Sequence, residues 1–152
     1  MSSKDIAPPS LTGPRLMSWT LPYRIPFSDV DHAGIVFYAH IFTYCHLAFE
    51  HLYLEAVGEP ISTIFTRRGY ATPVVATEAV FRRPMRHGDT IVIDVHAEHV
   101  GTSAFTLGFL FKGEAGEERC TARVTHAAIA WPGFTKIPIP DDLGLVLSLR
   151  RS

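Results

Sequence analysis

Residues 40–57, HIFTYCHLAFEHLYLEAV, are the stretch that decides the fold. Apolar side chains recur three and four positions apart along it, which is the spacing of one face of a helix. The residues on or beside that face are Ile41, Phe42, Cys45, Ala48, Phe49, Leu52, Tyr53 and Ala56. Thr43, His46 and Glu50 leave only a narrow polar stripe, and Gly58 predicts the end of the helix. A helix this apolar must be covered on most of its sides.

The rest of the chain predicts a sheet as that cover. Short segments rich in β-branched and aromatic residues alternate between apolar and polar positions, with a period of two. They are residues 23–27 before the helix, and residues 74–81, 90–98, 103–112 and 119–131 after it. The connections between the last four are short, which favours antiparallel neighbours. We therefore expect an α+β domain in which a four-stranded meander, joined by one earlier strand, curls around a single long helix.

Composition limits the domain organisation and the partners. The chain has 152 residues, 47% of them hydrophobic and 19% charged, with a net charge of −1. This balance predicts one globular domain over residues 21–152, preceded by a flexible arm over residues 1–20. The basic residues are scattered, so no nucleic-acid partner is expected. No apolar run approaches the length of a membrane span, and two cysteines without a CxxC spacing favour the cytoplasm.

Two motifs flank the predicted helix and bring a family resemblance. The first is DVDHAGIVFY, residues 29–38, which resembles the D-x-D-x-x-G-x-V signature of the 4-hydroxybenzoyl-CoA thioesterase family. The second is FRRPMRHGD, residues 81–89, which is similar to the strand-to-turn element of the same family. The resemblance runs from about Tyr23 to Trp131. It implies the hot-dog fold, a sheet of about five strands wrapped around one long central helix.

The resemblance also implies a reaction, the hydrolysis of an acyl- or aryl-CoA thioester. Asp31 matches the catalytic aspartate, and Tyr38 matches the residue whose backbone N–H polarises the thioester carbonyl. Such a carboxylate serves as nucleophile or as general base, and unpaired N–H groups at a helix start stabilise the oxyanion. Gly34 lets the backbone pass close to the substrate. Taken alone, Asp31 would be interpreted as a turn or cap residue, as Asp29 is.

Further residues are candidates for substrate contacts. His32 and His40 flank the motif at positions where relatives carry other residues, and Thr72 and Pro73 precede a predicted strand as in the bacterial 4-hydroxybenzoyl-CoA enzyme. The candidates for contacts with the phosphates of coenzyme A are Arg82, Arg83 and Arg86. No cofactor is expected beyond the coenzyme A of the substrate. No metal is expected either, because the histidine pairs of the helix lack the i,i+4 spacing of paired ligands. The resemblance implies a homodimer or homotetramer with active sites at the subunit interface.

Alternatives stay open at this point. A hot-dog hydratase or dehydratase is disfavoured, because those enzymes carry a His five positions after the Asp, where this chain has Val36. A non-catalytic module that binds acyl-CoA is a second alternative. Glu50 on the helix is a second candidate carboxylate, and acyl carrier protein is a second candidate thiol carrier. The nature of the acyl group is not fixed by the sequence.

Overall fold

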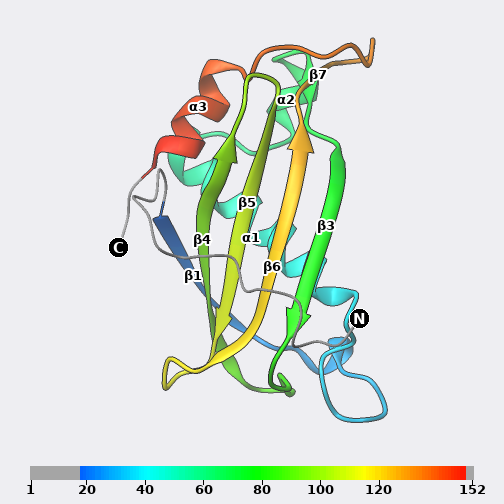
Figure 1. Ribbon diagram of the computed structural model, residues 1–152, viewed down its shortest axis with the longest axis vertical. Helices are drawn as coiled ribbons and strands as arrows, with labels where there is room; N and C mark the ends of the chain where they lie inside the picture. The colour runs from blue at the N-terminus through cyan, green and yellow to red at the C-terminus, as the bar shows by residue number, and fades with distance from the viewer. Residues whose placement is uncertain (1–17, 150–152) are drawn as a thin grey trace.

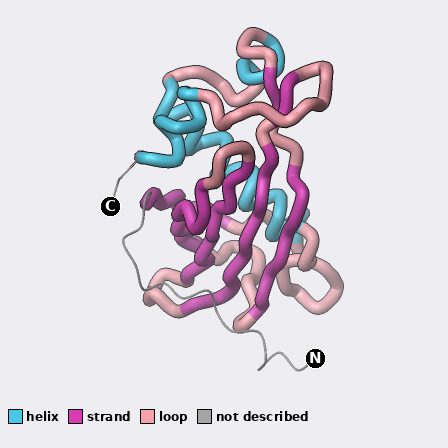
Figure 2. The backbone as a smooth tube through the Cα atoms, turned by 45° about the horizontal axis from the view of Figure 1, so that its top comes forward, coloured by secondary structure: helices cyan, strands magenta, loops and turns pink. Residues whose placement is uncertain are grey.

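A computed structural model of the chain describes residues 18–149 (Figures 1 and 2). In chain order its elements are β1 (Ser18–Arg24), the 3-10 turn η1 (Phe27–Asp29), α1 (His40–Val57), α2 (Thr63–Thr66), β2 (Tyr70–Ala71), β3 (Val74–Phe81), β4 (Thr90–Val100), β5 (Ala104–Lys112), β6 (Glu118–Ala127), β7 (Ile129–Ala130) and α3 (Asp141–Ser148). Residues 1–17, most of the predicted arm, lie outside the described residues. The part of the arm that is described, Ser18 to Thr20, belongs to β1, so the predicted boundary at residue 20 lies too late.

The central helix α1 has the limits that the sequence predicts. It runs for 18 residues, about 27 Å, and ends at Gly58, whose φ of 81° is left-handed. Its apolar face is fully buried, with Ile41, Ala48 and Leu52 inaccessible to solvent. Both views show α1 lying along one face of the sheet, behind β4, β5 and β6 (Figures 1 and 2). This arrangement, a curled antiparallel sheet around one long helix, confirms the hot-dog fold.

The order of the five main strands corrects one prediction. Neighbours in the sheet follow the order β1-β4-β5-β6-β3, and each adjacent pair is antiparallel. The predicted pairing of residues 74–81 with residues 90–98 is therefore wrong, because β3 pairs with β6 and lies at the edge. Residues 82–89 carry the chain past two strands. An extended connection of that length spans up to about 26 Å, well beyond three strand spacings of about 14 Å.

The first strand also differs from its prediction. We expected it over residues 23–27, but β1 occupies Ser18–Arg24 and pairs with β4 along its whole length. Pro26 lacks an N–H for the ladder, and residues Phe27–Asp29 form the 3-10 turn η1 instead. This turn begins the loop that carries Asp31.

The last described helix, α3, packs on the end of α1 that lies away from the Asp31 loop. The short helix α3 buries Leu143, Val146 and Leu147 in the common core. Its first turn carries Asp142, a buried carboxylate that accepts hydrogen bonds from the hydroxyls of Tyr53 on α1 and Tyr70 on β2. This polar cluster fixes α3 against α1, at the end of the helix opposite to the Asp31 loop (Figure 1).

The β3 strand forms an exposed edge of the sheet. Only its β6 side is paired within the described residues, and all eight of its residues are exposed or half-buried. Val74, Val75 and Phe81 are large apolar residues that are 51%, 61% and 48% exposed. Glu78 forms an ion pair with Arg123 of the same chain, with 2.9 Å between its Oε1 and Nη1 of Arg123. An apolar, charge-compensated strand edge without Lys or Pro invites a further strand.

Candidate active site

The loop between η1 and α1 is held from behind by the helix that follows it. The hydroxyl of Tyr44 on α1 donates a 2.7 Å hydrogen bond to Oδ2 of Asp29, while the backbone carbonyl of Asp29 accepts the N–H of Phe37 at 2.9 Å. Burial, followed by this hydrogen bond to a carboxylate, raises the pKa of Tyr44 well above its usual value. Asp29 therefore has the structural role that its place in the turn predicts.

The two sequence motifs meet in space. Ile35 of the first motif forms an antiparallel bridge with Arg86 of the second, and the N–H of Val36 donates to the carbonyl of Met85 at 2.8 Å. The connection that carries the second motif is held in turn by Arg119, whose guanidinium donates to the carbonyl of Pro84. The motifs thus form two walls of one site.

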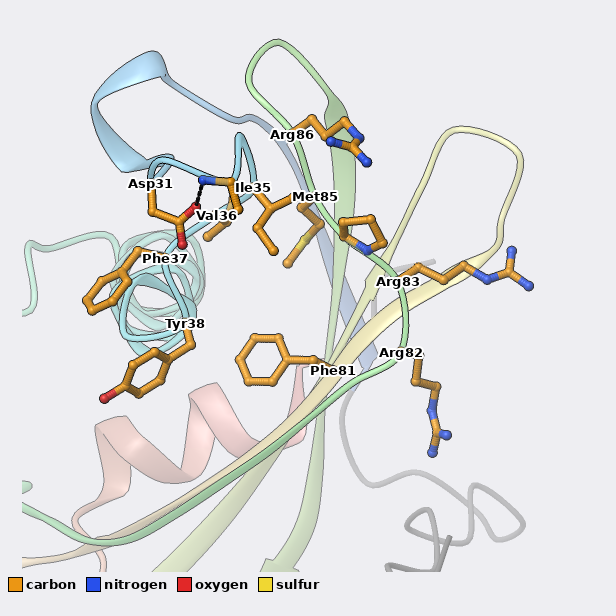
Figure 3. Close-up of a pocket in the computed structure, with 12 residues that line it drawn as sticks. Asp31, Ile35, Val36, Phe37, Tyr38, Phe81, Arg82, Arg83, Met85 and Arg86 are labelled. Atoms are coloured by element: carbon orange, nitrogen blue, oxygen red, sulfur yellow. Dashed lines mark hydrogen bonds between the residues drawn. The ribbon is translucent and has the colours of Figure 1, made fainter. Parts of the chain in front are cut away.

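A pocket of about 610 Å³ lies between these walls and the start of α1 (Figure 3). Its lining residues are Asp31, Ala33, Ile35, Val36, Phe37, Tyr38, Phe81, Arg82, Arg83, Pro84, Met85 and Arg86. Most of these side chains are apolar, Asp31 supplies a carboxylate, and three arginines line the other wall. Apolar walls and a cationic rim suit an apolar ligand that carries phosphate groups, and the carboxylate is available for chemistry on such a ligand.

Asp31 presents a carboxylate oxygen to this pocket. Its Oδ1 accepts the N–H of Ala33 at 2.8 Å, which fixes the side chain in a tight turn. Its other oxygen has no hydrogen-bond donor within residues 18–149 and points toward the start of α1, where Phe37 and Tyr38 lie (Figure 3). The carboxylate is exposed to solvent and oriented by its own loop. It is placed to act on a bound molecule or a water.

The backbone at Tyr38 supplies a hydrogen-bond donor on the same side of the pocket. The amides of His40 and Ile41 donate to carbonyls three residues back, whereas the amide of Tyr38 has no acceptor in the described part of the chain. An unpaired N–H just before a helix carries partial positive charge. Gly34, with a φ of 76°, makes the turn that brings the chain from Asp31 to this amide.

The predicted substrate contacts divide into two groups. His32 lies in the exposed Asp31 turn, and His40 begins α1 with its ring edge-on to Phe37 at 6.1 Å; neither lines the pocket. Thr72 and Pro73 precede β3, whereas the pocket adjoins its other end, about 27 Å away along the strand. Within one copy of the chain they are not brought together with Asp31. All four roles stay predictions.

The three predicted phosphate-binding arginines all line the pocket. Nε of Arg82 lies 3.6 Å from Oε2 of Glu118. Arg83 and Arg86 have no carboxylate partner among the described residues. The side chains of Arg82 and Arg83 extend away from Asp31, on the outer side of the connection (Figure 3). Arg82 and Arg83 are therefore at the rim of the pocket, away from the Asp31 carboxylate (Figure 3).

Sequence reasoning missed the apolar wall of the pocket. Phe81 and Met85 belong to the second motif, but only its arginines were predicted to contact the substrate. Phe81 is 48% exposed and faces the pocket opposite Tyr38 (Figure 3). The sequence signal for Phe81 was an aromatic side chain at the first position of that motif.

The other chemical groups lie elsewhere. Glu50 pairs with His46 at 3.1 Å on the exposed stripe of α1 and does not line the pocket. Cys45 and Cys120 are buried, free thiols, and burial raises the pKa of Cys120 to about 12. Within residues 18–149, no group of three or more His, Cys, Asp or Glu side chains is gathered as metal ligands would be. No described helix is long and apolar enough to cross a membrane.

Residues 25–147 match the sequence pattern of the Thioesterase-like superfamily. This match covers most of the chain, and the chain belongs to that superfamily. The relatives described next are thioester hydrolases, and the chain is an enzyme of that class.

Individual relatives make the likeness more specific. A 1,4-dihydroxy-2-naphthoyl-CoA hydrolase from Microcystis aeruginosa is 32% identical, over 81% of this chain and 89% of its own. Among solved structures, a 1,4-dihydroxy-2-naphthoyl-CoA thioesterase from Synechocystis is 22% identical and aligns with a TM-score of 0.78, over 86% of this chain and 95% of its own. A 4-hydroxybenzoyl-CoA thioesterase mutant in complex with 4-hydroxybenzoyl-CoA is 22% identical, with a TM-score of 0.76, over 85% and 98%. These two structures support the fold.

Proposed function

We propose that the chain hydrolyses an aromatic acyl-CoA thioester to the free acid and coenzyme A, with Asp31 as the catalytic carboxylate. The observation that carries this proposal is the pocket that holds a free carboxylate oxygen of Asp31 and the unpaired N–H of Tyr38 on one side. The aromatic rings of Phe37 and Phe81 supply apolar walls. The hydrolases among the curated relatives support a bicyclic aromatic acyl group such as 1,4-dihydroxy-2-naphthoyl.

The reaction follows from the position of the two groups. The thioester oxygen accepts the Tyr38 N–H, which stabilises the negative charge that develops when the carbonyl carbon is attacked. Asp31 attacks that carbon to form a mixed anhydride, or removes a proton from a water that attacks it. In both routes the C–S bond breaks and coenzyme A leaves as the thiolate. Water then opens the anhydride in the first route, whereas the second route gives the acid directly.

The first experiment measures release of free thiol from a panel of thioesters. The panel contains 1,4-dihydroxy-2-naphthoyl-CoA, 4-hydroxybenzoyl-CoA, acetyl-CoA and an acyl carrier protein thioester. Asp31→Asn should reduce kcat by about 10²- to 10⁴-fold, whereas Glu50→Gln, whose carboxylate lies outside the pocket, should match the wild type. Undiminished hydrolysis by Asp31→Asn would remove the mechanism, and loss in Glu50→Gln would move the chemistry to the helix.

A second measurement separates the two roles of Asp31. When excess enzyme is mixed with the aryl-CoA and quenched with acid, an anhydride route leaves the protein heavier by the mass of the acyl group. A general-base route leaves the protein mass unchanged at every quench time. The intact-protein mass spectrum distinguishes them.

We further propose that the working form is a homodimer joined along β3, in the cytoplasm. The unpaired, apolar β3 edge supports this partner, because an antiparallel strand edge is complementary to an identical copy rotated by a two-fold axis. Glu78 is already compensated by Arg123, so two copies meet without uncompensated charge on the strand. Light scattering should give twice the chain mass of 16.9 kDa. Thr77→Lys in the middle of the edge should shift the protein toward monomers.

A further inference from the structure

Two large aromatic side chains project into solvent just after β7. Trp131 is 44% exposed and Phe134 is 66% exposed. Their rings lie 5.3 Å apart in an edge-to-face arrangement, so the two form one apolar tip. We name residues 131–134 the aromatic tip. Exposed apolar patches often mark contact sites for a partner.

The backbone holds this tip in a fixed shape. The amide of Trp131 donates to Gly69 at 2.9 Å, and the amide of Phe134 donates to Ala130 at 2.8 Å. Phe134 has a φ of 60°, which is uncommon and costly for a bulky side chain. Strained backbone conformations of this kind cluster at functional sites. The Phe134 ring is therefore held outward on a strained backbone.

The aromatic tip and the Asp31 loop both extend beyond the β3 edge of the sheet. In Figure 1 the segment that follows β7 projects past β3 at the top, and the loop that contains Asp31 projects past β3 at the bottom. The tip adjoins the start of β3, because Ile129 and Ala130 pair with Ala71 and Tyr70 just before that strand. The pocket adjoins the end of β3, at Phe81.

A two-fold axis between two paired β3 strands brings the aromatic tip of one copy near the Asp31 loop of the other. In an antiparallel pair of β3 strands, the start of one strand lies beside the end of the other. The aromatic tip of one copy then faces the pocket of the other copy. The same rotation brings Thr72 and Pro73 toward that pocket, which they cannot reach within one chain.

We propose that Trp131 and Phe134 of a second copy cover the acyl end of the pocket and select aromatic acyl groups. This proposal rests on the proposed function and on the dimer along β3. The substrate ring would lie between Phe81 of one copy and the aromatic tip of the other, where ring contacts favour a planar aromatic group over a small aliphatic one. Trp131 and Phe134 are thus specificity-determining residues supplied in trans.

The first arm of the test measures specificity in the full-length protein. Trp131→Ala with Phe134→Ala should lower kcat/KM for 1,4-dihydroxy-2-naphthoyl-CoA by about 10- to 200-fold, with little change for acetyl-CoA. Trp131→Leu with Phe134→Leu keeps apolar volume but removes the rings, and should give an intermediate loss. Leu145→Ala, an equally exposed apolar change on α3, is the matched control and should match the wild type. An equal loss for both substrates, or no loss, overturns the selective role.

The second arm asks which copy supplies the tip. Asp31→Asn and the double alanine variant are co-expressed with different tags, and the mixed dimer is isolated by two affinity steps. In trans, one site of the mixed dimer combines an intact Asp31 with an intact tip, so it should show about half of the wild-type activity toward the aryl-CoA. If the tip serves its own chain, the mixed dimer stays as impaired as its parents, which overturns the proposal.

Failure of the proposed function would give a different result from failure of this inference. A wild-type protein that hydrolyses no thioester refutes the former, whereas an active wild type with unaltered specificity in the tip variants refutes only the latter. Light scattering on the alanine variant shows whether the dimer persists. If the alanine variant is monomeric or misfolded, the leucine variant is used for both the specificity measurement and the mixed-dimer measurement.

Discussion

The hydroxyl of Tyr44 and the carboxylate of Asp29 form a 2.7 Å hydrogen bond that joins the central helix to the loop that carries Asp31. The two residues come from different elements, and the bond is partly buried and anchors the chain two residues before Asp31. The geometry of the proposed site therefore depends on a contact that does not touch the substrate.

Tyr44→Phe should lower the free energy of unfolding by about 1–2 kcal/mol, because it removes the donor and leaves Asp29 without it. It should also lower kcat, since a small displacement of Asp31 misaligns attack on the carbonyl. Urea unfolding and steady-state thiol release measure the two effects. Tyr23→Phe is the matched control, because the Tyr23 ring packs against Tyr44 but its hydroxyl makes no hydrogen bond within residues 18–149. Equal effects in both variants would contradict the assignment.

Gly34→Ala tests the backbone of the same loop. A Cβ at Gly34 would meet no atom within 4 Å, so its only cost is the φ of 76°, about 1 kcal/mol. We expect this modest loss of stability together with a loss in kcat of about tenfold or more. Gly144→Ala is the control, because Gly144 is equally open but lies in α3 at ordinary helical φ. A change in stability without any change in kcat would show that the loop tolerates the shift.

The sequence predicted those features that local periodicity and turn chemistry determine. The helix over residues 40–57 has the predicted ends, because its apolar face is wide and Gly58 provides the left-handed cap. The pairing of β3 with β6 could not be obtained in this way. A connection of the length of residues 82–89 reaches either an adjacent strand or one across the curled sheet, and only the packing around α1 decides between them.

The residues of the candidate site divide in the same way, into those that short-range sequence predicts and those that it does not. The motif residues Asp31 and Tyr38 lie on one loop, so their common pocket follows from short-range sequence. Thr72 and Pro73 were predicted from a resemblance alone, and a single copy of the chain does not bring them to the pocket. The helix α3 was missed because it is short and follows a Pro-rich segment. Its signals were Asp141 and Asp142 after Pro140, followed by apolar residues at helical spacing.

The buried carboxylate of Asp142 gives a prediction about stability alone. Asp142→Ala should cost about 3 kcal/mol or more, because it leaves the hydroxyls of Tyr53 and Tyr70 buried without their acceptor. Tyr70→Phe should cost about 1–2 kcal/mol. Denaturant unfolding measures both, and Asp141→Ala, an exposed neighbour, is the control with little effect. The folded Tyr70→Phe variant should keep its kcat, since this cluster lies at the end of α1 away from the pocket of its own chain and the Tyr70 hydroxyl bonds to Asp142 within the cluster. A fall in kcat would contradict that separation.

His126 makes stability depend on pH below neutrality. Its ring is buried and stacked on Phe105 at 5.0 Å, with Nδ1 donating to the carbonyl of Thr72 at 2.9 Å. Burial is the main cause that lowers the pKa of His126, and the positive field of His46 adds to it, while the bond to Thr72 opposes it. Below about pH 6.5 the unfolded chain takes up a proton at this residue that the folded chain does not bind.

Stability that is present above the unfolded pKa is therefore lost as the pH falls from about 6.5 toward the lower folded pKa, at up to about 1.4 kcal/mol per pH unit. His126→Gln keeps a donor for Thr72 but does not titrate, so its free energy of unfolding should fall less steeply over that window, whatever its value at pH 8. His51→Gln, at an exposed position on α1, should keep the wild-type slope. Urea unfolding at half-unit steps of pH measures all three proteins, and equal slopes for wild type and His126→Gln would assign the acid sensitivity to other groups.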